Sequence, residues 1–293
     1  MTTLVRMLIE CASKGGNFLL DVGPTPEGPM PQPAVERLEA IGRWMARNGE
    51  SIYGTSAGPF RRQLAWGRAT MKTLPQGDTR LYLHVFDWPK DAVLRVPILY
   101  NQPLGAHLLG DPNRTPLATR RDGPAILVTL PAAMPDPAAS VVVLDVHGPA
   151  DVRPIPIAPG ADGRITLRAS DADIHGSTAR YLSRPGVEAI GFWTDTNDWV
   201  SWPVRIEKPG RYQLEVVYGC EKGQGGGRYV LSIADQSLTV TARDTGGWAK
   251  YVTERIGTLV VPHAGEETVS VRLQSKPGVA VMDLSEVRLI PSR

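Results

Sequence analysis

The stretch Ser13–Pro24, SKGGNFLLDVGP, decides how the first part of this chain folds. The residues before it recur at helical spacing and predict a helix over residues 3–12: Leu4, Val5, Leu8, Ile9 and Ala12. Gly15-Gly16 interrupts that pattern, and the apolar run Phe18-Leu19-Leu20 predicts a buried strand. A turn-rich loop then leads to a second predicted helix, over residues 34–47, which Asn48-Gly49 ends. Helix, strand and helix in this order are typical of α/β architecture, in which a parallel strand is buried on both faces.

One strand cannot form a sheet, and the pattern changes after residue 55. Short alternating runs such as LYLHVF (81–86), AILVTL (125–130) and SVVVLDV (140–146) predict a β-sandwich over residues 56–147. Residues 148–164 are rich in Pro and Gly and predict a linker. Residues 165–293 are expected to form a jelly-roll sandwich. Its strands are predicted near residues 210–219, 228–233, 257–261, 268–274 and 281–290.

Charge and cysteine content exclude several classes of function. The chain has 32 Lys and Arg against 30 Asp and Glu, and neither sign forms a long block. We therefore expect no nucleic-acid or anionic-membrane partner, and no run is long enough for a membrane span. Cys11 and Cys220 lie far apart and have no metal-type spacing, so both are predicted to be buried thiols. The five histidines are isolated from one another, and no metal site is predicted.

The opening of the chain resembles the α-L-fucosidases of glycoside hydrolase family twenty-nine. LVRMLIECASKGGNFLLDVGPTPEG followed by AVERLEAIGRWMARNGESIYGT is similar to that family's last barrel strand and closing helix. GPF, WGRAT and LYLHVFDWP are similar to the β-sandwich that follows the barrel. The resemblance implies a mainly β fold: two β-sandwich domains preceded by a remnant, the last β/α unit, of a TIM barrel at residues 1–55.

The resemblance also implies which parts of the enzyme to look for. A complete barrel needs about 250 residues, and a retaining glycosidase needs two carboxylates about 5 Å apart. In the family the nucleophilic aspartate and the acid/base lie on earlier strands and loops, so no catalytic residue is assigned in this chain. Asp21 and Glu27 are expected to be structural, because one acid without a positioned partner cannot perform a double displacement.

These expectations predict a C-terminal fragment of a retaining α-L-fucosidase that is inactive alone, whose substrates would be fucosylated glycans. The remaining barrel portion on another chain is a further possible partner. The alternative is a non-catalytic carbohydrate-binding or scaffold protein. Secretion or periplasmic export is implied by the resemblance, although no signal peptide is recognised after Met1, and the compartment stays unknown.

From Leu167 onward the chain is similar to carbohydrate-binding modules of families 6 and 35. The phrases in order are LRASDADIHG, IGFWTDTNDWVSW, PGRYQLEVVYG, DTGGWAKYVT and AVMDLSEVRL. The resemblance implies that Trp248 and Phe192 stack on a sugar, with Trp193 as the alternative if the register shifts by one. Packing and binding are weighed equally for these rings.

Other positions of the module are assigned differently. Trp199 and Trp202 are expected to be core residues. Val281 stands where the family has a ligand-binding asparagine and cannot bond a hydroxyl. A structural Ca²⁺ site through Asp171 or Asp283 is left open, because Ala169-Ser170 replaces the family's Ala-Glu pair. No other cofactor is expected.

Overall fold

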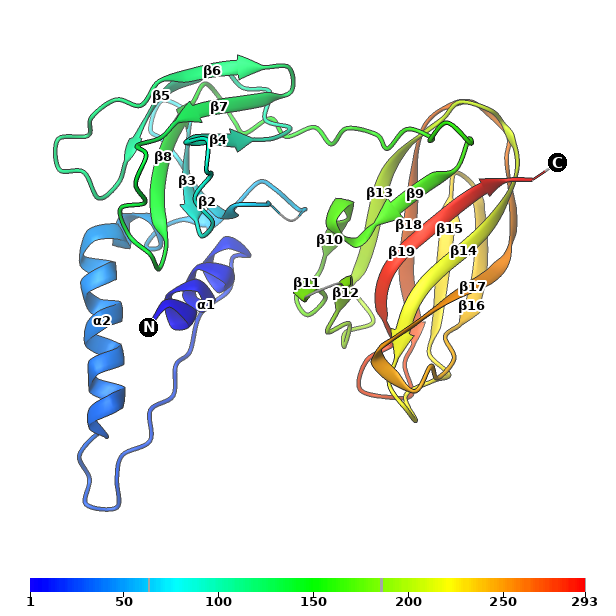
Figure 1. The fold of residues 1–293 in the computed structure, drawn as a ribbon, viewed down its shortest axis with the longest axis horizontal. Coiled ribbons are helices and arrows are strands. Elements are labelled where there is room, and N and C mark those ends of the chain that lie inside the picture. The colour runs from blue at the N-terminus through cyan, green and yellow to red at the C-terminus, as the bar shows by residue number, and fades with distance from the viewer. Residues whose placement is uncertain (63, 185–186, 293) are drawn as a thin grey trace. The chain divides into compact units, whose positions relative to one another are not determined.

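A computed structural model describes residues 1–62, 64–184 and 187–292 (Figure 1). The described chain divides into two compact units. Unit 1 consists of residues 1–60 and 64–153, and unit 2 of residues 154–292 together with Arg61 and Arg62. Among the described residues, no helix combines the length and the apolar character that a membrane crossing requires.

Unit 1 begins with two helices and continues as a β-sandwich. The helices are α1 (Thr2–Ser13) and α2 (Gln32–Asn48), followed by the 3-10 turn η1 (Gly49–Ser51). The strands are β1 (Ser56–Ala57), β2 (Gly67–Thr73), β3 (Thr79–Val85), β4 (Val93–Val96), β5 (Pro103–Leu108), β6 (Thr119–Asp122), β7 (Ala125–Thr129) and β8 (Ser140–Val146). They form a sheet in the order β1-β2-β3-β8-β5 and a second sheet in the order β4-β7-β6, all antiparallel.

The two helices pack on the sandwich through one apolar stripe each. Val5 and Ile9 of α1 and Trp44 of α2 are buried against the face of β3 and β8 that points away from the sandwich core. The Trp44 indole N–H donates to the carbonyl of Ala139 at 3.0 Å. Arg6 adds two bonds from α1, to the carbonyls of Ala138 and Phe86. The helical spacing in the sequence thus correctly predicts both helices and the faces that they bury.

The predicted strand between the helices is wrong in this structure. Residues 16–24 have no regular secondary structure, and the Leu19 side chain is 92% exposed. A strand is held by hydrogen bonds to its neighbours, and no neighbouring strand lies beside this stretch in the described part of the chain. The sequence pattern is that of a buried strand, but no neighbouring strand in the described chain pairs with this stretch or buries it.

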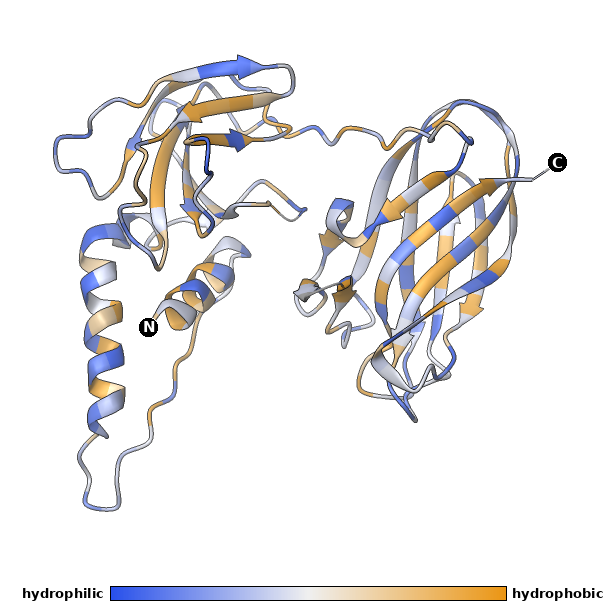
Figure 2. Ribbon diagram, in the orientation of Figure 1, coloured by the Kyte–Doolittle hydropathy of each residue, from blue (hydrophilic) through white to orange (hydrophobic). Residues whose placement is uncertain are grey.

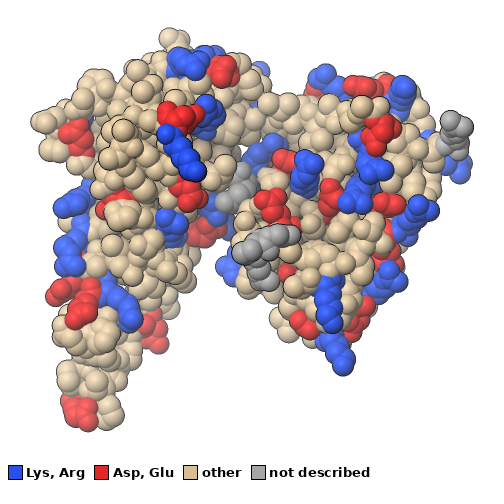
Figure 3. Space-filling view, in the orientation of Figure 1, with Lys and Arg blue, Asp and Glu red and all other residues tan. Residues whose placement is uncertain are grey.

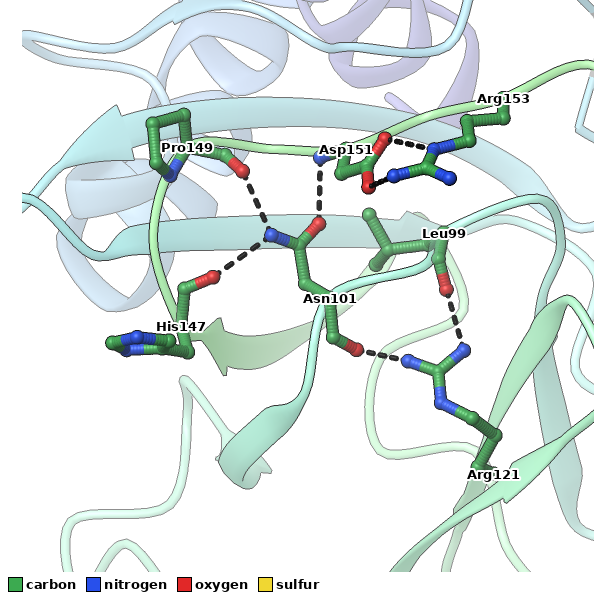
Figure 4. A network of polar contacts seen from close by, with 7 residues as sticks. All are labelled: Leu99, Asn101, Arg121, His147, Pro149, Asp151 and Arg153. Atoms are coloured by element: carbon green, nitrogen blue, oxygen red, sulfur yellow. Dashed lines mark hydrogen bonds and ion pairs between the residues drawn. The ribbon is translucent and has the colours of Figure 1, made fainter.

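A buried asparagine fixes the end of the unit 1 sandwich (Figure 4). The Asn101 amide donates to the carbonyls of His147 and Pro149 and accepts from the N–H of Asp151. Arg121 donates to the carbonyls of Leu99 and Asn101 from the neighbouring strand β6. The side chain of one residue therefore pairs three backbone groups of the segment that leaves β8, where the predicted linker begins.

Unit 2 contains the remaining elements and is built from two facing sheets. They are β9 (Ile165–Arg168), the 3-10 turn η2 (Ala169–Asp171), β10 (Asp173–His175), β11 (Arg180–Arg184), β12 (Val187–Gly191), β13 (Trp199–Ile206), β14 (Gly210–Cys220), β15 (Arg228–Ile233), β16 (Gln236–Thr241), β17 (Gly247–Val261), β18 (Gly265–Ser275) and β19 (Asp283–Pro291). One sheet has the order β10-β13-β18-β15-β16. The other has the order β11-β12-β19-β14-β17, with β9 also paired to β19.

The two sheets of unit 2 enclose one apolar core. Its inward positions alternate along each strand, as in Val200, Trp202, Val204 and Ile206 of β13. Figure 2 shows this alternation as stripes along the strands. The predictions of a mainly β chain and of two β-sandwiches are confirmed, and the strands predicted within the two sandwiches are present.

Candidate functional site

The predicted sugar-binding rings lie at one end of the β11-β12-β19-β14-β17 sheet, here called the rim. We define the rim as Phe192, Trp248 and the loops 221–227, 242–246 and 276–282. Gly219 of β14 pairs with Asp283 of β19, and Cys220 pairs with Gly247 of β17, so these strands reach the same edge. From β12 to β17 there are three strand spacings, about 14 Å. Phe192 and Trp248 therefore lie at the same end of one sheet, where its strands begin or finish.

Phe192 follows β12 and points into solvent beneath an arginine. Its side chain is 45% exposed, and its backbone has the left-handed φ of +54°. The Arg180 guanidinium lies 3.6 Å from the centre of the Phe192 ring, within the range of a cation–π contact. Arg180 reaches it from β11, where it pairs with Gly191. One face of the ring is thus occupied by a cation from the neighbouring strand.

Trp248 lies near the start of β17 and is half-buried. Its strand approaches β14 very closely, since a Cβ added to Gly219 would lie 2.2 Å from the Trp248 carbonyl oxygen. Glycine at position 219 is therefore required for Trp248 to take this place. The sequence motif TGGW identifies Trp248 as a candidate, but it does not indicate that glycine is needed at position 219 of the neighbouring strand.

The rim loops are cross-linked by polar contacts. The Asp244 carboxylate accepts from the backbone N–H groups of Gly223 and Gly246 at 2.5 and 2.7 Å. These hydrogen bonds hold the pKa of Asp244 below its usual range, with a further contribution from Lys222 and Lys250. Gln224 accepts from the N–H of Val279 at 2.6 Å, which joins the first loop to the third. These bonds give the exposed rim a defined shape.

Trp193 and Asp198 support the rim from inside. Trp193 is fully buried, and its indole N–H donates to the Asp198 carbonyl at 3.0 Å. It therefore offers no face to a ligand in this structure, and we leave it out of the site proposed below. Val281 is also buried, and its N–H contacts the Trp193 carbonyl.

The prediction that Trp199 and Trp202 are both core residues is half wrong. Trp202 is fully buried, and its indole N–H donates to the Arg168 carbonyl. Trp199 lies on the outer face of β13, between the imidazole of His175 at 3.6 Å and the guanidinium of Arg272 at 3.5 Å. Three positions separate the two tryptophans, and side chains an odd number of residues apart point to opposite faces of a strand. Both faces of the Trp199 ring are covered.

The structure offers little for a metal or for a strongly charged ligand. Within residues 1–62, 64–184 and 187–292, no three His, Cys, Asp or Glu side chains form a group that could hold a metal ion. Asp283 is buried, and in the described part of the chain it belongs to no such group with Asp171. Figure 3 shows acidic and basic side chains interspersed over the visible face. We therefore assign no calcium site.

The acids considered for catalysis lie in unit 1 and are not paired. Asp21 is exposed and lines a groove of about 590 Å³ between α1, α2 and the stretch 20–23. Glu27 lies in the exposed turn that follows. Another cavity, of about 210 Å³, has Asp111 and Asp136 in its wall. Both of these carboxylates accept hydrogen bonds from backbone N–H groups of their own loops.

Comparison with known proteins identifies the relatives of this chain. Residues 1–50 match the family model described as alpha-L-fucosidase. The α-L-fucosidase of Dictyostelium discoideum is 39% identical over 104 residues, which are 36% of this chain and 21% of that protein. The human tissue α-L-fucosidase is 33% identical over 93 residues, which are 32% of this chain and 19% of that protein. The chain thus spans about a fifth of the length of these curated relatives.

A solved structure shares the fold over nearly the whole chain. The α-L-fucosidase from Vibrio sp. strain EJY3 superposes with a TM-score of 0.52 at 24% identity, over 98% of this chain and 50% of that one. At this identity the likeness shows the fold alone. Together with the sequence matches, it identifies this chain as a relative of the C-terminal part of the α-L-fucosidases.

Proposed function

We propose that this chain is the C-terminal part of a retaining α-L-fucosidase, which hydrolyses terminal α-L-fucosyl bonds of glycans. The match of residues 1–50 to the fucosidase family model carries the proposal. The sequence matches to curated fucosidases and the fold shared with the Vibrio enzyme support it.

Catalysis is assigned to the part of the enzyme that these residues do not contain. A retaining glycosidase places two carboxyl groups about 5 Å apart on either side of the scissile bond. The groove in unit 1 has one acid in its wall, Asp21. In unit 2, Glu266 and Glu267 line one cavity but are adjacent on β18, so their side chains point to opposite faces. None of these cavities has the required pair.

The partner proposed for unit 1 is the remainder of a fucosidase barrel. In this proposal α1, the stretch 16–22 and α2 form the last β/α unit, and the stretch becomes a strand when barrel strands lie on both sides. Its apolar run Phe18-Leu19-Leu20 and its unpaired backbone support the proposal, because a parallel strand is buried on both faces and requires both neighbours.

Purified chain should release no 4-nitrophenol from 4-nitrophenyl α-L-fucoside above the buffer rate. The reason is that neither carboxylate of the double displacement is assigned within it. The measurement is absorbance at 405 nm over hours, with a complete α-L-fucosidase as positive control. Turnover at the usual enzyme rate of about 1 to 1,000 per second would contradict the assignment.

Co-expression provides the complementary measurement. A fucosidase barrel that lacks its own last β/α unit should gain activity with this chain and not with a chain shortened by residues 1–55. If the full chain gives no gain, the proposed role of unit 1 is refuted.

For unit 2 we propose carbohydrate binding at the rim, with Phe192 and Trp248 as the stacking residues. Sugar rings present apolar C–H faces that pack on aromatic planes. Phe192 is exposed, Trp248 is half-buried, and the loops around them are held by Asp244 and Gln224. Such a module would hold the enzyme on a glycan while the barrel acts.

Trp248→Ala should weaken glycan binding by about 5-fold or more, because stacking on one aromatic ring contributes on the order of 1 kcal/mol. The measurement is titration calorimetry against a glycan found on an array, repeated with Phe192→Ala. Tyr100→Ala is the matched control, since Tyr100 is an exposed aromatic of unit 1. Binding that survives the loss of both rim rings would remove the rim from the proposal.

A further inference from the structure

Trp248 lies in a bulge of β17, beside the end of β14. The ladder between the two strands shifts its register between Tyr218 and Cys220, so residues 248–251 lie opposite Gly219 alone. Extra residues in a bulge have no partner in the ladder, and the local ladder is disrupted. Strand pairing by itself therefore does not fix the Trp248 ring, and contacts from outside the ladder have to do so.

The rim loop 242–246 leads into this bulge and is bonded to the end of β14. The Thr245 hydroxyl accepts from the backbone N–H of Cys220 at 2.8 Å, and the Thr245 N–H donates to the Cys220 carbonyl at 3.1 Å. Two residues earlier in the loop, the backbone N–H of Arg243 donates to the Tyr218 hydroxyl at 3.0 Å. A side chain of the sandwich core thus holds the backbone of a rim loop.

Glu254 of β17 orients the Tyr218 hydroxyl for this bond. Tyr218 is fully buried, and its hydroxyl donates to Oε2 of Glu254 at 2.5 Å. Burial and the bond to Glu254 raise the pKa of Tyr218 to about 12, so the hydroxyl keeps its proton. Because that proton is directed at the carboxylate, the hydroxyl oxygen is available to accept from Arg243. Carboxylate, phenol and loop N–H therefore form one chain of hydrogen bonds.

Two other core tyrosines of unit 2 lack this connection to the rim. Tyr229 of β15 is also fully buried, but its hydroxyl has no hydrogen-bond partner among the described residues. Tyr212 lies at the other end of β14 and donates to the Lys208 carbonyl at 2.6 Å, in the turn before that strand. Comparison of the three phenols therefore separates the bond to the rim loop from burial in the same core.

We propose that Tyr218 and Glu254 are positioning residues of the rim, which hold the loop 242–246, and through it Trp248, in the conformation that binds a glycan. The inference rests on the carbohydrate binding proposed for unit 2 and adds two residues that act through the loop. A loop that is already ordered loses less conformational entropy when the ligand binds. Binding residues are held most accurately where hydrogen bonds behind them fix their backbone.

Tyr218→Phe should weaken glycan binding about 5-fold, the order expected when one hydrogen bond is lost from a loop that the ligand must then fix. The probe is an array of fucosylated oligosaccharides, followed by calorimetry with the one that binds the wild-type chain most strongly. Tyr229→Phe and Tyr212→Phe delete the same atom away from the loop, and both should bind as wild type does. Wild-type affinity in Tyr218→Phe would overturn the inference, as would equal weakening in Tyr212→Phe.

Substitution of Glu254 tests the other end of the chain of hydrogen bonds. Glu254→Ala should weaken binding as much as Tyr218→Phe does, whereas Glu254→Gln should bind nearly as wild type, because its amide oxygen still accepts from Tyr218. The ion pair that Glu254 makes with Arg243 at 3.6 Å is expected to matter little, since the Arg243 side chain is 60% exposed. Equal weakening by alanine and glutamine would refute the role of the hydrogen bond.

Hydrogen exchange without any glycan separates this inference from the proposed function. Amides of residues 242–247 should exchange about 5-fold faster in Tyr218→Phe than in the wild-type chain, and at the wild-type rate in Tyr212→Phe. If no oligosaccharide on the array binds the wild-type chain, carbohydrate binding at the rim is refuted, and the exchange rates still decide whether Tyr218 holds the loop. Unchanged exchange in Tyr218→Phe would refute the positioning role whatever the array shows.

Discussion

Replacing Asp198 by alanine is expected to remove about 3 to 5 kcal/mol from the free energy of unfolding of unit 2. The carboxylate is almost completely buried and accepts four hydrogen bonds. Three come from the backbone N–H groups of Ser177, Thr178 and Ala179, and one from the Thr178 hydroxyl. Burial alone would raise the pKa of Asp198, but these donors hold it below its usual range. Alanine would leave all four donors without this acceptor, and the N–H of Ala179 is buried.

Urea denaturation and hydrogen exchange of peptides from residues 199–206 would measure the loss in unit 2. Asp195→Ala is the matched control in the same loop, because Asp195 is only partly buried and its carboxylate accepts from the backbone N–H and the side-chain amide of Asn197. Its effect should stay within about 0.5 kcal/mol. The Asp198→Ala variant should also weaken the proposed glycan binding at the rim, since the carboxylate fixes the loop whose Asp198 backbone carbonyl accepts from the Trp193 indole next to Phe192. An Asp198→Ala protein as stable as the Asp195→Ala protein would show that the loop does not depend on this carboxylate.

Strand periodicity in the sequence is enough to predict most of the two sandwiches. Long apolar runs such as SVVVLDV and RYQLEVVYG are strands: burial alternates along the second, whereas the first is buried on both faces, in the sandwich core and under the helices. The strands without a prediction include short or polar ones, such as β10 (Asp173–His175) and β16 (Gln236–Thr241). β10 is too short to show an alternation, whereas burial alternates along β16, and each strand is defined by its pairing, with β13 and β15 respectively.

The candidate site shows a different limit of sequence analysis. Phe192 and Trp193 are adjacent and must point in opposite directions, but the sequence does not say which one is buried. The left-handed φ of Phe192 and the bond from Trp193 to Asp198 decide it. For Trp199 and Trp202 the odd spacing in DWVSW already indicates that only one of the two rings can lie in the core. Arg180 over Phe192 depends on the pairing of β11 with β12, which no local motif encodes.

In the stretch Asn17–Gly23, between α1 and α2, the local sequence pattern predicts a strand that the structure does not contain. Phe18-Leu19-Leu20 has the composition of a strand buried on both faces, but only one face is partly buried here and Leu19 is exposed. Pairing is a property of neighbours, however, and residues 1–55 provide two helices and no second strand.

A second expected result of large size concerns His84, which is fully buried in unit 1 between the helices and the sheet. Its Nε2 lies 3.1 Å from the Thr70 hydroxyl, which itself donates to the Ser51 carbonyl at 2.6 Å. Because the Thr70 proton is already used, His84 must donate from Nε2, and its Nδ1 has no partner among the described residues. Burial lowers the pKa of His84 to about 3, against a smaller opposing effect of Ser51. The ring is held neutral.

Unit 1 should therefore lose stability as the pH falls below about 6.5, the ordinary pKa of histidine. In that range the unfolded chain binds a proton that the folded chain excludes, and the stability present above pH 6.5 decreases by about 1.4 kcal/mol per pH unit until the folded pKa is reached. Between pH 6.5 and 4.5 the loss from this one ring is about 3 kcal/mol. His84→Gln keeps an N–H for Thr70 and cannot take up the proton, so its stability should fall less over the same interval. The measurement is hydrogen exchange of peptides from residues 79–85 in urea at both pH values, with the exposed His147→Gln as control. Equal acid sensitivity in the His84→Gln and wild-type proteins would show that the proton enters elsewhere, because no other feature of this buried ring changes with pH.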